Sequence, residues 1–322
     1  MTETSTPTTP EQLAAALESV WPGARNVQVE AIPESHSGFT YMVDAELEGR
    51  PVGGVLRLPP PGARPLGPAD VMRQARIMSA LAEAGLPMAA ILASSEEPVL
   101  DGRPFVLMEK VDGVRIEKAV ETAEPRDLVN KAFATARAMH ALPAAATGIA
   151  GEESYGPAEE VARWQALRAR APEEYVQRAP ELEARLLAAL PARREPKLVH
   201  GDYHLGNLLF RGGEVVAVLD WEIAELGQAP LDEAALCLVA IRIRFGEPQP
   251  GAEAALPLAE MIELAGAGPD FDWFLAATCH KYGAILGYNL GLHRRGKRID
   301  PIYEELLKTI PGLFDAGLEI LG

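Results

Sequence analysis

The stretch LVHGDYHLGNLLFRGGEVVAVLDWE, residues 198–222, combines polar side chains with two short apolar runs. The run LLF is followed by RGG, which is typical of a tight turn, and then by the second run, EVVAVLD. This order predicts a β-hairpin. Because a hairpin returns the chain towards its starting point, we expect Asp202, Asn207 and Asp220 to converge at one edge of it.

These three residues are of the types that phosphoryl transfer requires. Magnesium prefers oxygen ligands, commonly one or two carboxylates together with phosphate and water. The side-chain oxygens of Asn207 and Asp220 suit that role. A carboxylate beside an accepting hydroxyl can orient it and take its proton, which suits Asp202. The pattern therefore predicts Asp202 as the catalytic base and Asn207 and Asp220 as magnesium ligands.

Two other interpretations of the stretch stay open. The polar residues could serve only as caps and turns, although the joint pattern with His200 and Gly201 is more specific than one Asp–Asn pair. Alternatively, His200, Asp202 and His204 would share one face of a strand and could bind zinc for hydrolysis. The zinc hydrolase is the weaker alternative, because the remaining histidines are scattered along the chain without a partner at ligand spacing.

The motif HGDYHLGN followed by VLDWE resembles the aminoglycoside phosphotransferase and choline kinase family, which is related to the protein kinases. Within that family, VVAVLDWEIAELG is most similar to phosphotransferase domains related to those fused to acyl-CoA dehydrogenases. The resemblance covers nearly the whole chain. It implies ATP and Mg²⁺ as cofactors and a small-molecule hydroxyl as phosphate acceptor, either aminoglycoside-like or hydroxyacyl-CoA-like.

The resemblance also implies where the nucleotide binds. A loop between the first two strands would approach the phosphates, a basic residue on the third strand would contact them, and a connecting segment would meet the adenine. The residues at these places are Ser37, Gly38, Arg57, Glu109 and Val111.

Two positions depart from the kinase pattern. Arg57 stands where kinases carry a lysine, and Gln74 takes the place of the glutamate that pairs with it. Arginine keeps the positive charge but differs from lysine in reach and geometry, and Gln74 could accept a hydrogen bond from it. These departures leave a second hypothesis, a non-catalytic nucleotide-binding relative.

Hydrophobic periodicity and turn signals divide the chain into three segments. Residues 1–24 form a tail and a helix, residues 25–110 an antiparallel sheet with one inserted helix, and residues 111–322 a mainly helical part. With the resemblance, this predicts an α+β, bilobal, protein-kinase-like fold. The helices expected in the third segment span residues 126–141, 157–169, 180–190, 232–245, 252–265, 271–292 and 303–320.

Composition restricts the environment and the partners. The 322 residues carry a formal charge of −16, which disfavours nucleic acid and anionic membranes as partners. There is no apolar run long enough to cross a bilayer, no signal peptide, and only two cysteines, Cys237 and Cys279. We therefore expect a cytoplasmic protein with reduced thiols. Candidate acceptor contacts include Glu222, Glu225 and the basic stretch at 293–298, and the oligomeric state stays open.

Overall fold

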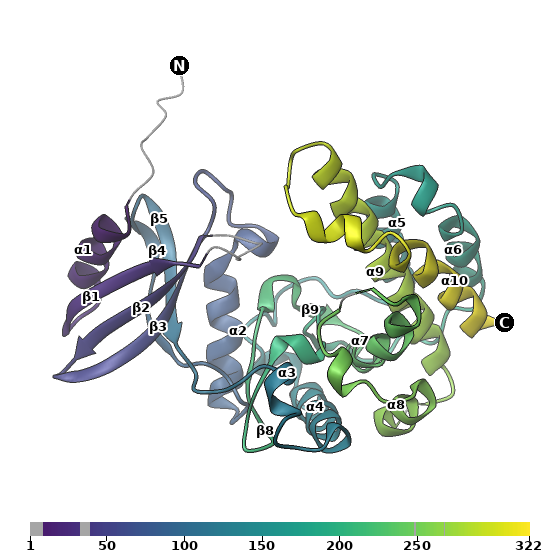
Figure 1. Ribbon diagram of the computed structural model, residues 1–322, viewed down its shortest axis with the longest axis horizontal. Helices are drawn as coiled ribbons and strands as arrows, with labels where there is room; N and C mark the ends of the chain where they lie inside the picture. The colour runs from purple at the N-terminus through teal and green to yellow at the C-terminus, as the bar shows by residue number, and fades with distance from the viewer. Residues whose placement is uncertain (1–8, 33–38, 248, 267) are drawn as a thin grey trace. The chain divides into compact units, whose positions relative to one another are not determined.

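The computed structural model describes residues 9–32, 39–247, 249–266 and 268–322, which form two compact units (Figure 1). The smaller unit runs to Asp112 and also includes residues 146–149 and 220–223. The larger unit contains residues 113–145, 150–219 and 224–322. The chain therefore leaves the smaller unit after Asp112 and returns to it for two short segments.

The smaller unit is built on one antiparallel sheet with strand order β1-β2-β3-β5-β4. Helix α2 (Val71–Glu83) is inserted between β3 and β4, and its amide at Arg73 is capped by the side chain of Asp70. The sheet and its single inserted helix confirm the arrangement predicted from the sequence. The strands are β1 (Ala24–Ala31), β2 (Phe39–Leu47), β3 (Arg50–Leu58), β4 (Ile91–Leu100) and β5 (Arg103–Glu109).

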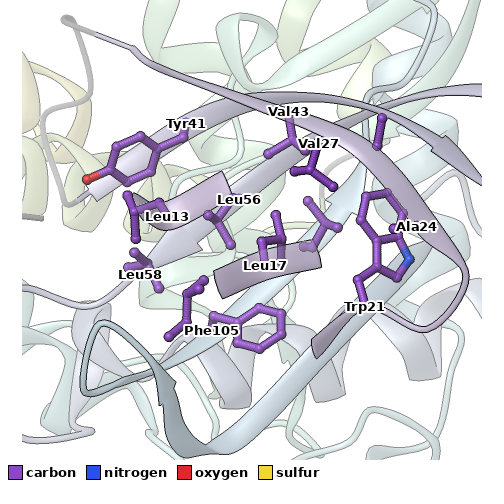
Figure 2. Packing of buried hydrophobic residues seen from close by; sticks show 13 residues of the cluster. Leu13, Leu17, Trp21, Ala24, Val27, Tyr41, Val43, Leu56, Leu58 and Phe105 are labelled. Atoms are coloured by element: carbon purple, nitrogen blue, oxygen red, sulfur yellow. The ribbon is translucent and has the colours of Figure 1, made fainter. Parts of the chain in front are cut away.

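Helix α1 (Pro10–Val20) packs its apolar face on this sheet. Thr9 and Gln12 form the reciprocal capping box that starts the helix. Leu13 and Leu17, one turn apart, are fully buried, and each contributes about 1.5–3 kcal/mol by leaving water. Figure 2 shows the cluster that they enter, whose other members include Trp21, Val43, Leu56, Leu58 and Phe105.

The larger unit is mainly helical. Its helices are α3 (Ile116–Ala119), α4 (Pro125–His140), α5 (Pro157–Arg168), α6 (Ala179–Ala188), α7 (Pro230–Arg242), α8 (Leu258–Ala265), α9 (Phe271–Arg294) and α10 (Thr309–Leu321). Its strands form two pairs, β6 (Lys197–Val199) with β9 (Glu225–Gly227), and β7 (Leu208–Arg211) with β8 (Glu214–Val218). The second pair is the predicted hairpin, turning through Gly212 and Gly213, both at positive φ.

The long helix α9 packs against α5, α7 and α10 (Figure 1). Gly283 permits the close approach of α10, because a Cβ atom at this position would lie only 2.6 Å from the ring of Phe314. α9 is buried on nearly all sides over its first half. Polar side chains in that half therefore face other parts of the protein.

Two expected helices begin later than their sequence periodicity indicated. The helix expected over 252–265 is a short 3₁₀ turn at Ala252–Ala254 followed by α8, because Pro257 disfavours helical backbone at the residue before it. The helix expected over 303–320 is likewise a 3₁₀ segment, Pro301–Glu305, followed by α10. The carboxylate of Glu247 fixes the start of α10, since it accepts from the N–H groups of Lys308 and Thr309 at 2.8 and 2.7 Å.

Across the described residues, the structure contains no helix of the length and apolarity that spanning a membrane demands. Cys237 and Cys279 are both buried and free, as the sequence predicted.

Candidate active site

The motif residues 200–207 form a tight loop between β6 and β7 in the larger unit. Gly201 adopts φ +84°, a conformation that suits glycine, and the loop ends in a 3₁₀ turn over Leu205–Asn207. The backbone N–H of Asn207 donates to the carbonyl of His204 at 2.9 Å. This folding turns the side chain of Asn207 back towards Asp202.

The carboxylate of Asp202 is held by two donors. The hydroxyl of Tyr282 in α9 donates to Oδ1 at 2.5 Å, and the amide Nδ2 of Asn207 donates to Oδ2 at 3.2 Å. Nε2 of His204 lies 3.6 Å from Oδ2. The side chain keeps 30% of its surface exposed. Asp202 is thus fixed in orientation and still accessible to a reactant.

The surroundings keep Asp202 ionised. Burial raises the pKa of this carboxyl, but the electrostatic attraction of His204 and the hydrogen bond from Tyr282 outweigh it and hold the pKa well below its usual range. An ionised carboxylate is what a group that accepts the proton of an attacking hydroxyl requires.

Asn207 presents its side-chain oxygen away from Asp202. Its Nδ2 donates to both the backbone carbonyl of Asp202, at 2.9 Å, and the carboxylate. Within the described residues no partner is found for its Oδ1. A free amide oxygen beside a carboxylate belongs to the oxygen donor set that magnesium prefers, so this residue fits the predicted ligand role. Asp202 and Asn207 are in contact, as predicted.

His200 is engaged at both ring nitrogens. Nε2 bonds to the carbonyl of Leu219 at 2.7 Å, and Nδ1 accepts from the N–H of Asp202 at 3.2 Å. The side chain is fully buried. His200 therefore has no free nitrogen for zinc, and among the residues described no group of three His, Cys, Asp or Glu side chains could hold a metal ion. The alternative zinc site is not formed.

Asp232, at the start of α7, holds the loop at its first two residues. Its fully buried carboxylate accepts from the N–H groups of His200 and Gly201, at 2.8 and 3.1 Å. Nε2 of His140 lies 3.0 Å from the same carboxylate, and its Nδ1 lies 3.3 Å from Glu233. Burial lowers the pKa of His140, but the two carboxylates more than compensate and raise it to about 9.

Helix α9 supplies a second anchor that sequence reasoning missed. The buried ammonium of Lys281 donates to the carbonyl of Gly201 and lies 5.1 Å from the centre of the Trp164 ring. Lys281 and Tyr282 together hold the loop at Gly201 and Asp202. The run His280-Lys281-Tyr282 in an apolar helix was the available signal, because buried polar side chains require partners.

The smaller unit contains the predicted basic residue on β3. Arg57 is 15% exposed; its Nη1 donates to the side-chain oxygen of Gln74 at 3.1 Å and lies 3.5 Å from the carboxylate of Asp220. Its Nη2 pairs with Glu222. The predicted bond from Arg57 to Gln74 is confirmed. The acidic partner, however, comes from Glu222, two residues after Asp220, and not from α2.

Asp220 follows directly after β8 and Leu219, whose N–H donates to the carbonyl of Asn207 at 2.8 Å. It adopts φ +65°, which is uncommon for a residue other than glycine and marks local strain. Its carboxylate is 44% exposed and thus accessible to a ligand. Asp220 belongs to the smaller unit, and its convergence with Asp202 and Asn207 stays a prediction.

The structure describes only some of the other residues predicted to contact the nucleotide. Ser37 and Gly38 lie outside the described residues. At the end of β5, the N–H groups of Glu109 and Lys110 donate to the carbonyls of Ala90 and Gly53. Over the described ranges, Val111 N–H has no such acceptor. A purine acceptor could therefore bind at Val111, whereas Glu109 N–H is already engaged.

Several residues that the sequence suggested as contacts for the phosphate acceptor already have partners in the protein. Glu222 pairs with Arg57, and the buried Glu225 pairs with Arg163. In the basic stretch at 293–298, Arg294 forms ion pairs with Glu304 and Glu174. Glu222, Glu225 and Arg294 thus already have partners within the protein.

Comparison with solved structures places this fold among known phosphotransferases. A Ralstonia eutropha protein provisionally described as an aminoglycoside phosphotransferase is 23% identical, with a TM-score of 0.76 and coverage of 97% of this chain and 98% of that chain. The GDP complex of aminoglycoside 2'-phosphotransferase-IIIa is 14% identical, with a TM-score of 0.68 and coverage of 96% and 99%. A spectinomycin phosphotransferase solved with ADP and spectinomycin is 14% identical, with a TM-score of 0.61 and coverage of 98% of each chain.

Similar sequences include segments of much longer proteins. Mouse acyl-CoA dehydrogenase family member 10 is 32% identical over 195 residues, which is 57% of this chain and 18% of the mouse protein. Mouse family member 11 is 29% identical over 197 residues, which is 57% of this chain and 25% of that protein. The matches thus span only a quarter or less of these relatives.

Residues 29–268 match the model of the phosphotransferase enzyme family. This match covers most of the chain and agrees with the fold and with the motif around Asp202, which confirms the resemblance read from the sequence. The chain therefore belongs to the phosphotransferase enzyme family.

Proposed function

We propose that the protein transfers the γ-phosphate of ATP, with Mg²⁺, to a hydroxyl group of a small molecule. The observation that carries this proposal is the carboxylate of Asp202, which is accessible, ionised, and oriented by Tyr282 and Asn207. Similar folds solved with GDP or ADP support nucleotide as the phosphate donor.

Each residue has a defined part in the proposed reaction. Asp202 orients the acceptor hydroxyl and takes its proton, while the new P–O bond forms and the bond to the leaving ADP oxygen breaks. The free oxygen of Asn207 and the exposed carboxylate of Asp220 would hold magnesium. When bound, the ion neutralises charge on the phosphate oxygens.

The residues proposed to contact the nucleotide belong to the smaller unit. Arg57 would contact phosphate, and its bonds to Glu222 and Gln74 would fix its position. The N–H of Val111 would donate a hydrogen bond to a ring nitrogen of the adenine. Ser37 and Gly38 remain the proposed phosphate-loop residues.

The decisive experiment is magnesium-dependent ADP release across a panel of hydroxyl compounds, with the variant Asp202→Asn as the test of mechanism. Asparagine keeps the size of the side chain but cannot take the proton. We expect kcat to fall by about 10²–10⁴-fold, with the Kd for ATP changed less than threefold or so. Isothermal titration with ATP and a coupled ADP assay measure the two quantities.

The same assay distinguishes the proposed enzyme from the alternative, a protein that binds nucleotide without catalysing transfer. In that case ATP would bind tightly without ADP release at any acceptor. Normal turnover by Asp202→Asn would instead show that another group accepts the proton.

A further inference from the structure

Arg242, the last residue of α7, is a partly buried cation in the larger unit. Helix α7 packs against α9, which carries Tyr282. Burial lowers the pKa of the Arg242 guanidinium, while Tyr282, Asp202 and Glu247 act on it in the opposite direction. By geometry, Arg242 thus lies on a helix that packs against the helix whose Tyr282 donates to Asp202.

In the part of the chain that the structure describes, Arg242 has no hydrogen-bond or ion-pair partner, and its Nε is fully buried without one. Other arginines of this unit are satisfied by the protein: Arg115 donates to the carbonyl of Gly206 at 2.9 Å, and Arg168 binds both carboxylate oxygens of Glu183. Burying a polar nitrogen without a hydrogen-bond partner is costly. Arg242 therefore lacks a partner that a ligand could provide.

The two acidic residues that act on Arg242, Glu247 and Asp202, are hydrogen-bonded to other groups. Both carboxylate oxygens of Glu247 accept from the first amides of α10. The carboxylate of Asp202 is bonded by Tyr282 and Asn207. Neither acid forms an ion pair with Arg242. The charge of Arg242 is therefore not neutralised by a direct contact with either of them.

The chain that follows α7 closes on the loop that carries Asp202. A Cβ atom at Gly206 would lie 2.5 Å from Pro250, and one at Gly251 would lie 2.9 Å from Leu205. In this closely packed segment, Gln249 buries both its amide nitrogen and its amide oxygen without a partner. Unsatisfied polar groups thus occur on both sides of the turn after α7, next to the reactive loop.

We propose that Arg242 binds an oxyanion of the phosphate acceptor, a carboxylate or a phosphate ester, and that the enzyme acts on an anionic hydroxyl compound. Guanidinium groups bind such oxyanions through paired hydrogen bonds. A polycationic acceptor would instead place like charge against Arg242. This inference rests on the proposed function, because it assigns the acceptor of that same reaction.

The test compares Arg242→Gln with Arg244→Gln. Arg244 lies two residues further on, is exposed, and pairs with Glu319 at 2.9 Å, so it is a matched control outside the site. The acceptors are 3-hydroxybutyrate, glycerol 3-phosphate, the neutral 1,3-butanediol and the polycation kanamycin. The ADP assay gives kcat and KM for each acceptor and for ATP.

We expect the wild type to prefer an anionic acceptor, and the two anions to distinguish a carboxylate from a phosphate ester. Arg242→Gln should raise KM for the preferred anion by about 10–100-fold. It should leave the KM for ATP and the activity on the neutral acceptor nearly unchanged. Arg242→Lys should recover part of the loss, because it restores the charge without the paired donors. Arg244→Gln should behave as the wild type.

The outcomes separate this inference from the proposed function. If the wild type turns over but favours kanamycin or the neutral diol, or if Arg242→Gln leaves the anion preference intact, the acceptor assignment is wrong and the phosphotransferase proposal stands. If the wild type releases no ADP with any acceptor, the proposed function fails and takes this inference with it. A thermal unfolding scan of each variant identifies loss of fold as the cause of lost activity.

Discussion

At the scale of single residues, the orientation of one carboxylate depends on one hydroxyl. Tyr282 donates to Oδ1 of Asp202, while Asn207 holds Oδ2. Burial, followed by the charge of Asp202, raises the pKa of the Tyr282 hydroxyl well above its ordinary value. The hydroxyl therefore stays protonated and donates throughout the physiological range.

Replacing Tyr282 by phenylalanine should lower kcat by about tenfold, because the carboxylate loses a positioning donor and samples unproductive rotamers. The KM for ATP should change little. The same substitution in an Asp202→Asn background should have almost no further effect, since the hydroxyl acts through that carboxylate. The ADP assay measures all three variants.

Tyr203→Phe is the matched control for this prediction. Tyr203 is fully buried and donates to the carbonyl of Ala132 at 2.9 Å. Its loss should reduce the free energy of unfolding by about 1 kcal/mol and leave kcat unchanged. Equal losses of kcat in the two variants would mean that Tyr282 supports the fold only.

At the scale of elements, helices α4 and α7 are joined by the ionic contact of His140 with Asp232 and Glu233. The same Asp232 carboxylate holds the loop at His200 and Gly201. Burial raises the pKa of Asp232, but the hydrogen bond from His140 more than offsets it, so this acid stays ionised. Protonation of His140 therefore stabilises both the helix pair and the base of the loop.

This contact predicts a loss of stability at alkaline pH. The folded pKa of His140, about 9, lies above its unfolded value of 6.5. Its contribution is thus complete below about pH 6.5 and disappears as the pH rises through about 9. A difference of about 2.5 units corresponds to about 3 kcal/mol. Urea unfolding of the wild type and His140→Gln from pH 6 to 9.5 measures it.

The difference between the two proteins should be largest at pH 6 and should shrink steadily towards pH 9.5. His293→Gln, at the end of α9, is the control, because His293 accepts a hydrogen bond from the N–H of Asp300. Parallel pH curves for the wild type and His140→Gln would contradict a protonated His140.

At the scale of the whole molecule, a ligand that binds only the folded chain must raise its resistance to heat. Free ligand at one hundred times its Kd adds about 2.7 kcal/mol to the free energy of unfolding. We therefore expect Mg²⁺ and a non-hydrolysable ATP analogue together to raise the Tm by several degrees. Differential scanning calorimetry with and without EDTA measures how much of this shift depends on the metal.

EDTA should remove most of the shift in the wild type. In Asp220→Asn and Asn207→Leu, the metal-dependent part should be small from the outset, while binding of the nucleotide alone persists. A shift of the same size with EDTA present would exclude the proposed magnesium ligands. The formal charge of −16 makes it necessary to keep ionic strength constant in these scans.

The sequence by itself determined the features that arise from neighbours along the chain. The capping box of Thr9 and Gln12, the five strands, helix α2 and the RGG hairpin follow from local propensity and periodicity. The contact of Asp202 with Asn207 was also predictable, because only four residues lie between them and one turn joins them. The same motif carried the resemblance to the family, which the family model over residues 29–268 confirmed.

Only the tertiary structure decided which distant groups meet. Tyr282 lies 80 residues from Asp202, and Glu222 lies 165 residues from Arg57. The start of α10 likewise depends on Glu247, about 60 residues earlier. No local periodicity encodes such pairings, because they result from packing whole helices and strands so that buried polar groups find partners. The unsatisfied Arg242 is visible for the same reason: its lack of a partner is a property of the folded chain.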